Sequence, residues 1–392
     1  MTHARSRIRQ HASTVAALLL AASLGGCSSK GAVHLRRGDQ ALAAGRYAEA
    51  ISAYTHAREL APDSEVAQQG LMRARAALVA EQPMRLSAET AEDLRYEAAL
   101  LAETDPARAA TYLTALGNIS SRFGNAEDAR ARFDAALKSD PRSVVAHTAL
   151  GVFLLGQKES AGRAREEFEK VVELRPGSAV ALVGLAQLAL GEGKVDAAVE
   201  KLEAAIKVGD DFTARMLLGG ARLKQSKSDE AITQFTRATQ LDPRSAEAHR
   251  ALGQALLSAG KAEEAERSLR TAAAIVQDAP TALALGFALQ RQKKADQALG
   301  QFALVLQSSG GDPAAMYGAA SALEDLGRKD EALVMYKRLA ALPPSAGGGA
   351  PLMAQLQQQA VVRTAALEGK GEGAGSAPLA PMPPGAAPHR AP

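Results

Sequence analysis

Apolar and small side chains recur at intervals of three and four residues through most of the chain between residues 31 and 346. This spacing places them on one side of an α-helix, and no stretch shows the alternation of polar and apolar residues that is typical of a β-strand. The helical stretches come in pairs, separated by short breaks that contain glycine or proline. The pattern therefore predicts an all-α protein made of helix-turn-helix units.

Small and aromatic residues occupy matching places in successive pairs. The stretches that begin at Gly38 and Gly117 share a glycine seven residues on, an alanine twelve on and an aromatic ring sixteen on. Because Gly117 and Gly151 are 34 residues apart, as are Gly219 and Gly253, the unit repeats along the chain. We expect the small residues to mark close helix contacts. The aromatic rings expected to fill the remaining space are Tyr54, Phe133, Phe168, Phe235, Phe302 and Tyr336.

A second glycine lies between the two helices of most units. Its place predicts a left-handed backbone that ends the first helix, a conformation that glycine adopts without steric cost. The residues concerned are Gly45, Gly124, Gly193, Gly260 and Gly327.

The period and the residue pattern resemble the tetratricopeptide repeat. The resemblance implies a right-handed superhelical solenoid over residues 31–346, with about eight units. We place them at 31–64, 110–143, 144–178, 179–211, 212–245, 246–278, 279–312 and 313–346. Residues 65–109 lack the signature and are interpreted as a degenerate hairpin; a hinge, a separate docking surface and a loosely packed spacer remain alternatives.

The composition changes after the last unit. Residues 347–368 are expected to form a linker and a capping helix. Residues 369–392 are rich in proline, glycine and alanine, which predicts a disordered tail.

The N-terminus has the layout of a secretory signal. Three arginines and no acidic residue precede an apolar run over residues 12–24, and Gly25 and Gly26 then lead to Cys27, the single cysteine. This order resembles the lipobox of bacterial lipoproteins. The resemblance implies a signal peptide over 1–26, acyl chains such as palmitate on Cys27, and a short tether over 27–30. Because Ser28 follows rather than aspartate, it also implies the outer membrane, facing the periplasm. An ordinary signal peptide, giving a soluble periplasmic protein, is the alternative.

Charge and composition argue against several classes of function. The net charge of +3 comes from the three arginines of the signal, and no basic block follows them; with aromatic residues at 4% and no Trp, nucleic-acid binding is not expected. No histidine in the repeats lies three or four residues from another, and no phosphate-binding loop appears. We expect no enzyme activity, no metal and no cofactor apart from the lipid on Cys27. The alternative hypothesis is an enzyme with an undetected site in residues 65–109 or in the tail.

In the tetratricopeptide family, the first helix of each unit lines the concave groove with its second, fifth, ninth and twelfth places, the last three of which share a helix stripe. The resemblance therefore implies a partner-binding groove of mixed, mostly apolar character. Its predicted members are Asn118, Val152, Leu155, Val183, Gln187, Leu190, Met216, Leu223, Arg250, Gln254, Leu257, Leu283, Phe287 and Tyr317. The lysine and asparagine clamp that chaperone-binding members use is missing. We expect an amphipathic helix or an extended apolar peptide as the ligand.

Over residues 12–346 the chain resembles the repeat lipoproteins of type IV and tight-adherence pilus assembly. This resemblance implies a scaffold that binds a protein partner and assists assembly of an envelope machine, such as a pilus or secretion system. An adaptor for peptidoglycan enzymes or for exopolysaccharide export has the same anchor and the same repeats, and remains an alternative.

Overall fold

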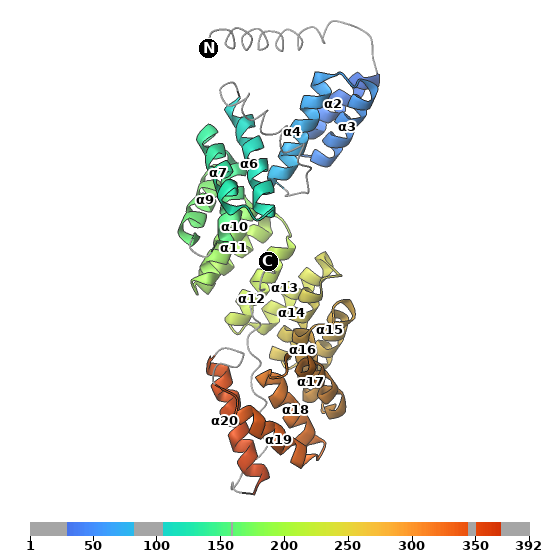
Figure 1. Cartoon of the computed structure of the whole chain (residues 1–392), viewed down its shortest axis with the longest axis vertical. Coiled ribbons are helices and arrows are strands. Elements are labelled where there is room, and N and C mark those ends of the chain that lie inside the picture. The colour runs from blue at the N-terminus through green and yellow to red at the C-terminus, as the bar shows by residue number, and fades with distance from the viewer. Residues whose placement is uncertain (1–29, 82–104, 158–159, 344–349, 370–392) are drawn as a thin grey trace. The chain divides into compact units, whose positions relative to one another are not determined.

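The computed structural model describes residues 30–81, 105–157, 160–343 and 350–369. Within these ranges the chain forms 18 helices and no strand (Figure 1), which confirms the all-α prediction. The helices divide into two compact units, Met1–Lys170 and Val171–Pro392. Cys27 with the predicted signal peptide, residues 82–104 of the expected hairpin, and the expected tail from residue 370 lie outside the described residues.

Helices of the first unit pack in pairs. The pairs are α2 (Lys30–Ala43) with α3 (Tyr47–Leu60), α6 (Pro106–Arg122) with α7 (Ala126–Ser139), and α8 (Val144–Leu155) with the start of α9 (Ala161–Leu174). Helix α4 (Glu65–Glu81) packs against both α3 and α6. The first unit is therefore a stack of helix pairs.

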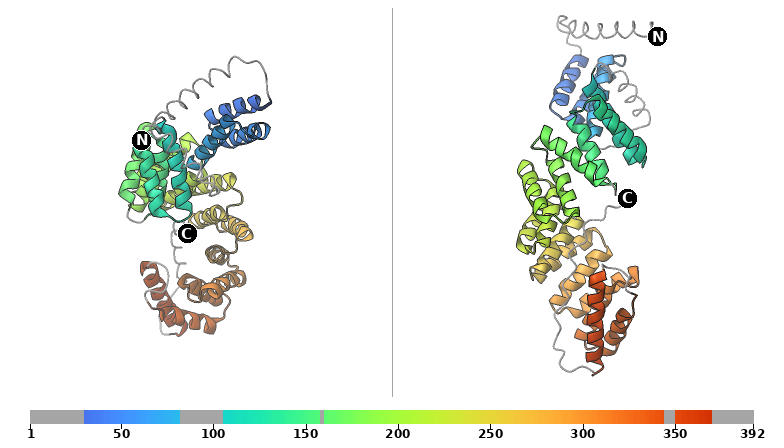
Figure 2. Two further views of the ribbon diagram at one scale, coloured as in Figure 1. Left: turned by 45° about the horizontal axis from the view of Figure 1, so that its top comes forward. Right: turned by 90° about the vertical axis from the view of Figure 1, so that its left-hand side faces the viewer.

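The second unit continues the same arrangement five times. Its pairs are α10 (Ala179–Gly191) with α11 (Val195–Val208), α12 (Phe212–Lys224) with α13 (Ser228–Leu241), α14 (Ala246–Ser258) with α15 (Ala262–Ile275), α16 (Ala279–Arg291) with α17 (Ala295–Ser309), and α18 (Pro313–Asp325) with α19 (Lys329–Ala340). A single helix, α20 (Ala350–Leu367), follows. Each second helix also packs against the next first helix, so the helices of the unit form one uninterrupted stack (Figure 2).

Side-chain caps set where the first helices begin. A serine or aspartate just before the helix accepts a hydrogen bond from the backbone N–H three residues later, an interaction worth about 1 kcal/mol. The capping residues are Asp105, Ser143, Ser178, Asp211, Ser245, Asp278 and Asp312. Because Asp105 caps α6 and Pro106 fits its first turn, this helix begins four residues before the unit predicted from residue 110.

The turn between the two helices of a pair has the predicted left-handed residue. The five glycines named above have φ between 70° and 79°. Ser226 and Lys293 adopt the same conformation, with φ of 61° and 60°, in two repeats that have no glycine there. These seven turns therefore share one geometry, although the residue that adopts it differs.

Aromatic rings fill the space beside the small residues, as predicted. A Cβ added to Gly219 would lie 2.6 Å from the Phe235 ring, and one added to Gly286 would lie 2.6 Å from the Phe302 ring. In the repeat between these two, Leu269 takes the place of the ring beside Gly253. These positions hold the two helices of a pair at a spacing that leaves no room for a methyl group.

Helix α4 shows that the repeat pattern continues beyond residue 64. The buried Tyr54 ring lies against Gly70 of α4 as closely as it lies against Gly38 of α2. Gly70 thus contacts the ring of the preceding pair, as Gly318 of α18 contacts Phe302 of α17. Helix α4 therefore has the position of the first helix of a further unit, and the rest of the predicted hairpin, residues 82–104, lies outside the described residues.

Helix α20 covers the end of the second unit. Its buried Leu356 and Ala360 join a cluster that includes Tyr336 of α19. Arg363 forms an ion pair with Glu324 of α18, with 2.6 Å between Nη2 and Oε1, and Gln357 donates a hydrogen bond to the Leu342 carbonyl at 2.6 Å. Because α20 contacts both α18 and α19, it occupies the place of the next first helix.

Candidate partner-binding face

The first helices of neighbouring repeats contact one another. In the second unit α10 contacts α12, α14 contacts α16 and α16 contacts α18. Among the described helices of this unit, no second helix makes a comparable contact with the next second helix. The stack is therefore closer together on the side of its first helices, which is the inner side of its curvature. We call this side the first-helix face.

Most predicted groove residues are half-buried. On the first-helix face of the second unit the half-buried members are Val183, Gln187, Leu190, Met216, Leu223, Arg250, Gln254 and Leu283. In the first unit, Leu155 of α8 is half-buried and Val152 of α8 is 41% exposed. Val183 and Leu190 pack against the core cluster of the α10–α12 region, and Met216 and Leu223 pack against the cluster around Phe235. Each of these four apolar side chains thus contributes to packing while part of it remains accessible.

Four other predicted members are buried. Asn118 is 8% exposed, Leu257 1%, Phe287 9% and Tyr317 4%. The Phe287 ring meets Phe302 edge to face, with centroids 5.1 Å apart, and Tyr317 meets Tyr336 in the same way at 5.8 Å. Such contacts stabilise the repeats themselves. All four side chains are therefore buried between helices and offer a ligand little surface.

Gln290 is a member of the stripe that the sequence analysis did not name. It occupies the twelfth place of its unit, three residues after Phe287, and is 5% exposed. Within the described part of the chain, neither its Nε2 nor its Oε1 has a hydrogen-bond partner. A buried, unpaired amide group costs about 1–3 kcal/mol. Because both amide atoms are covered, Gln290 offers a ligand as little surface as Phe287 does. Its twelfth place could have suggested it, but its burial could not be read from the sequence.

Polar contacts fix neighbouring repeats to each other. Glu266 of α15 is the clearest case: Lys294 donates to its Oε2 at 2.7 Å and Arg270 to its Oε1 at 2.8 Å. The hydrogen bond from Lys294 outweighs burial and, with those from Arg270 and Gln292, lowers the pKa of Glu266 to about 2. The carboxylate therefore stays charged at neutral pH and links α15 to the following pair.

His147 makes a similar link in the first unit. Its Nδ1 lies 2.6 Å from Glu167 Oε2, and its Nε2 lies 3.0 Å from the Pro141 carbonyl oxygen. Burial alone would lower the pKa of His147, but the hydrogen bonds to Glu167 and Pro141 outweigh it and raise the pKa. With both ring nitrogens protonated, the ring donates to both acceptors and ties α8 to α9.

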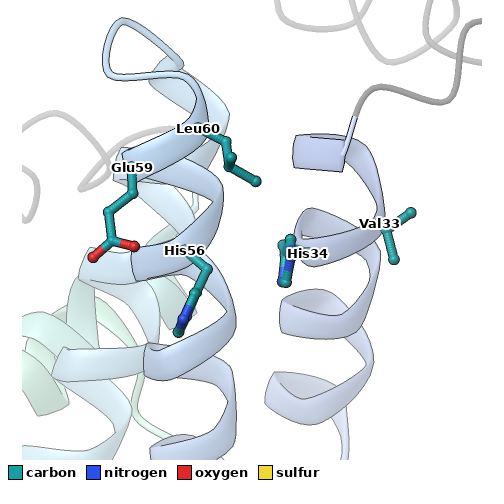
Figure 3. A pocket seen from close by; sticks show the side chains of 5 residues that line it. All are labelled: Val33, His34, His56, Glu59 and Leu60. Atoms are coloured by element: carbon teal, nitrogen blue, oxygen red, sulfur yellow. The ribbon is translucent and has the colours of Figure 1, made fainter.

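A pocket of about 400 Å³ opens on the first helix pair. It is lined by Val33, His34, His56, Glu59 and Leu60 (Figure 3). The His34 and His56 rings face each other between α2 and α3, stacked with centroids 5.5 Å apart. His56 Nδ1 also lies 2.8 Å from the Ser52 carbonyl oxygen, which orients its ring. The pocket is distinct from the predicted stripe.

Neither a metal-binding cluster nor a membrane-spanning helix is found in the part of the chain that the structure describes. No group of three or more His, Cys, Asp or Glu side chains there is placed to hold a metal ion. None of the helices in that part is long and apolar enough to cross a membrane. The first-helix face is thus the most extended candidate site.

Comparison with known proteins identifies the family of the repeats. The family model of the tetratricopeptide repeat matches residues 114–179, 183–232, 221–280 and 283–347, which together exceed half of the chain. None of the curated proteins matches this chain significantly. The solved structure of Pseudomonas aeruginosa PilF is 20% identical, with a TM-score of 0.49 over 54% of this chain and 96% of that one.

Two further solved structures are similar to a comparable extent. PilW, described as a widely conserved type IV pilus biogenesis factor, is 19% identical, with a TM-score of 0.47 over 50% of this chain and 92% of that one. YrrB, described as a repeat protein with an unusual peptide-binding site, is 19% identical, with a TM-score of 0.42 over 47% of this chain and 95% of that one. What the three share with this chain is the repeat fold.

Proposed function

We propose, starting from the fact that this chain belongs to the tetratricopeptide repeat family, that it is a lipid-anchored scaffold. It binds a protein partner in the periplasm along the first-helix face and assists assembly of an envelope machine such as a pilus or secretion system. Acyl chains on Cys27 hold it at the outer membrane. The basis for the anchor is the sequence around Cys27, and the basis for partner binding is the first-helix face.

The observation that carries partner binding is the mixed chemistry of this face. Half-buried apolar side chains such as Leu190 and Leu223 alternate along it with Gln187 and Gln254. Apolar contact supplies affinity for a helix or an extended peptide, and the amides fix its register.

A capture experiment with matched charge variants tests partner binding. Crosslinked complexes are purified from cells that express the full chain, the double variant Gln187→Glu with Gln254→Glu, or a control with Leu304→Glu and Val334→Glu. The control residues lie on second helices and are 53% and 67% exposed. Because an apolar ligand would have to desolvate the new carboxylates, capture by the first variant should fall by about tenfold or more.

The outcomes separate the possibilities. Partner binding is supported when one envelope protein is captured by the native chain and by the control, but not by the first variant. The proposal fails when both variants capture that protein equally while all three proteins remain equally helical. The anchor is tested separately: Cys27→Ala should abolish incorporation of labelled palmitate and move the protein out of the membrane fraction.

Gln290→Leu is a further control, because it should change the stability of the repeats without changing the surface that a ligand can contact. Replacing an unpaired buried amide by a side chain of similar size should stabilise the fold by about 1 kcal/mol. Capture should stay at the native level, because both amide atoms are covered in the native chain. A marked loss of capture by Gln290→Leu would show that the charge variants are not the only ones to disturb the site.

A further inference from the structure

The first helix pair exposes apolar side chains at one of its two ends. Helix α2 begins with Lys30, α3 ends with Leu60 and α4 begins with Glu65, so antiparallel packing brings these three termini together. Val33, Leu60 and Val66 lie within one turn of these termini and are 55%, 52% and 50% exposed. Figure 3 shows Val33 near the start of α2 and Leu60 at the end of α3. We call these three residues the apolar end.

Very few residues separate Cys27 from the apolar end. Only Ser28 and Ser29 separate Cys27 from Lys30, where α2 begins. Even a fully extended backbone spans only about 10 Å over this distance. Val33 is three residues into α2, a further rise of about 5 Å. If Cys27 carries lipid, the apolar end is close enough to the bilayer to contact the lipid head groups, a layer of several Å on each side of the hydrocarbon core.

The charges around the apolar end favour an apolar contact over an electrostatic one. Arg36 and Arg58 are exposed near it, and so are Glu59 and Glu65. These opposite charges balance, so the end presents no field of one sign to anionic lipid. Its free energy of membrane contact would come from Val33, Leu60 and Val66, which are of the type that interfacial helices insert among head groups.

We propose that the apolar end is a membrane-contact surface that docks the first helix pair onto the lipid bilayer. The proposal rests on the lipid anchor of the proposed function. The partner of this surface is the bilayer that holds the acyl chains of Cys27. Contact at both the acyl chains and the apolar end would fix the orientation of the first repeat, whereas an anchor alone would let it swing about the tether.

The absence of tryptophan from the chain allows a direct test. Leu60→Trp places a single fluorophore at the apolar end. Ala48→Trp is the matched control, because Ala48 is also exposed on α3 but lies about 18 Å along the helix from Leu60. Each full-length, lipidated variant is purified from the envelope and reconstituted into vesicles of phosphatidylethanolamine and phosphatidylglycerol, with and without brominated acyl chains.

We expect the Leu60→Trp emission to be blue-shifted in vesicles and largely lost with brominated lipid, whereas the Ala48→Trp emission is unchanged. Raising the salt concentration should not restore the emission. The inference is overturned if the protein is lipidated and vesicle-bound but Leu60→Trp emits as it does in water. If mass spectrometry finds no lipid on Cys27 and the protein does not bind vesicles, the anchor of the proposed function fails, and this inference fails with it.

Discussion

Adding one methyl group at Gly219 should destabilise its repeat, whereas adding one at the neighbouring Gly220 should not. A Cβ at Gly219 would lie 2.6, 2.7 and 2.9 Å from three carbons of the Phe235 ring, and Phe235 is only 3% exposed. Separations under 3.0 Å do not occur at a Cβ, so the ring or the helix must move. A Cβ at Gly220 would meet nothing within 4 Å.

The magnitudes follow from two opposing effects. Overpacking a close-packed core costs about 1–3 kcal/mol, whereas replacing glycine by alanine inside a helix gains about 0.5–1 kcal/mol. Gly219→Ala should therefore destabilise its repeat by about 1–2 kcal/mol. Gly220→Ala receives only the gain and should stabilise it by up to about 1 kcal/mol. The two variants differ in where one methyl group is placed and in nothing else.

Native-state hydrogen exchange is the suitable assay, because a stack of repeats opens locally and a single unfolding free energy would average over it. Opening free energies of amides in α12 and α13 are compared between the native chain and both variants. The double variant Gly219→Ala with Phe235→Leu should recover part of the loss, since Ala186 and the buried Leu202 form such a pair in the preceding repeat. Equal protection in Gly219→Ala and Gly220→Ala would refute the close-contact account.

Four further predictions follow. Ser226→Gly should stabilise its turn by about 0.5–1 kcal/mol, measured by the chemical-denaturation midpoint, because serine has φ of 61° there. Glu266→Gln should lower the free energy of unfolding by about 1–2 kcal/mol at pH 7, allowing for screening of its exposed partners. The carboxylate's contribution is complete above its ordinary pKa of 4.5 and is lost as the pH falls through the lowered pKa of about 2. The native chain and the variant should therefore be equally stable at that low pH. The raised pKa of His147 means that its contribution is complete below about 6.5 and is lost as the pH rises through the raised value. Exchange protection of α8 should therefore fall as the pH is raised above 6.5 in the native chain, but much less in His147→Asn. Leu356→Ala should cost about 2–4 kcal/mol and expose α20 to proteolysis while α10 to α16 keep their exchange protection.

The period of the sequence was sufficient to predict the repeat. A 34-residue spacing of small residues places a glycine and a ring opposite each other in most units, so Gly117 and Phe133 could be paired without a structure. Left-handed turns could be predicted only where a glycine signalled them. Ser226 and Lys293 give no such signal. Backbone hydrogen bonds close their turns, from Lys227 N–H to the Arg222 carbonyl and from Lys294 N–H to the Leu289 carbonyl, in a conformation that their own side chains disfavour.

The depth of each residue on the first-helix face could not be predicted in the same way. Helical spacing shows that Leu257 and Leu223 share a stripe, but Leu257 is 1% exposed and Leu223 is half-buried. This difference depends on how closely the neighbouring helices approach, which the spacing does not contain. The burial of Gln290 could not be predicted for the same reason. Its place in the repeat is that of a residue on the helix surface, and only the approach of neighbouring helices buries it.

The most direct test of the account is to map which side of the stack the partner touches. A photo-crosslinking amino acid is introduced singly into the full chain at Gln187 or Gln254 on the first-helix face, or at Leu304 or Val334 on second helices, and crosslinks are formed in living cells. The account predicts that one envelope protein is crosslinked from both first-helix positions and from neither second-helix position. Crosslinks to that protein from Leu304 and Val334 alone would contradict it and would place binding on the opposite side of the repeats.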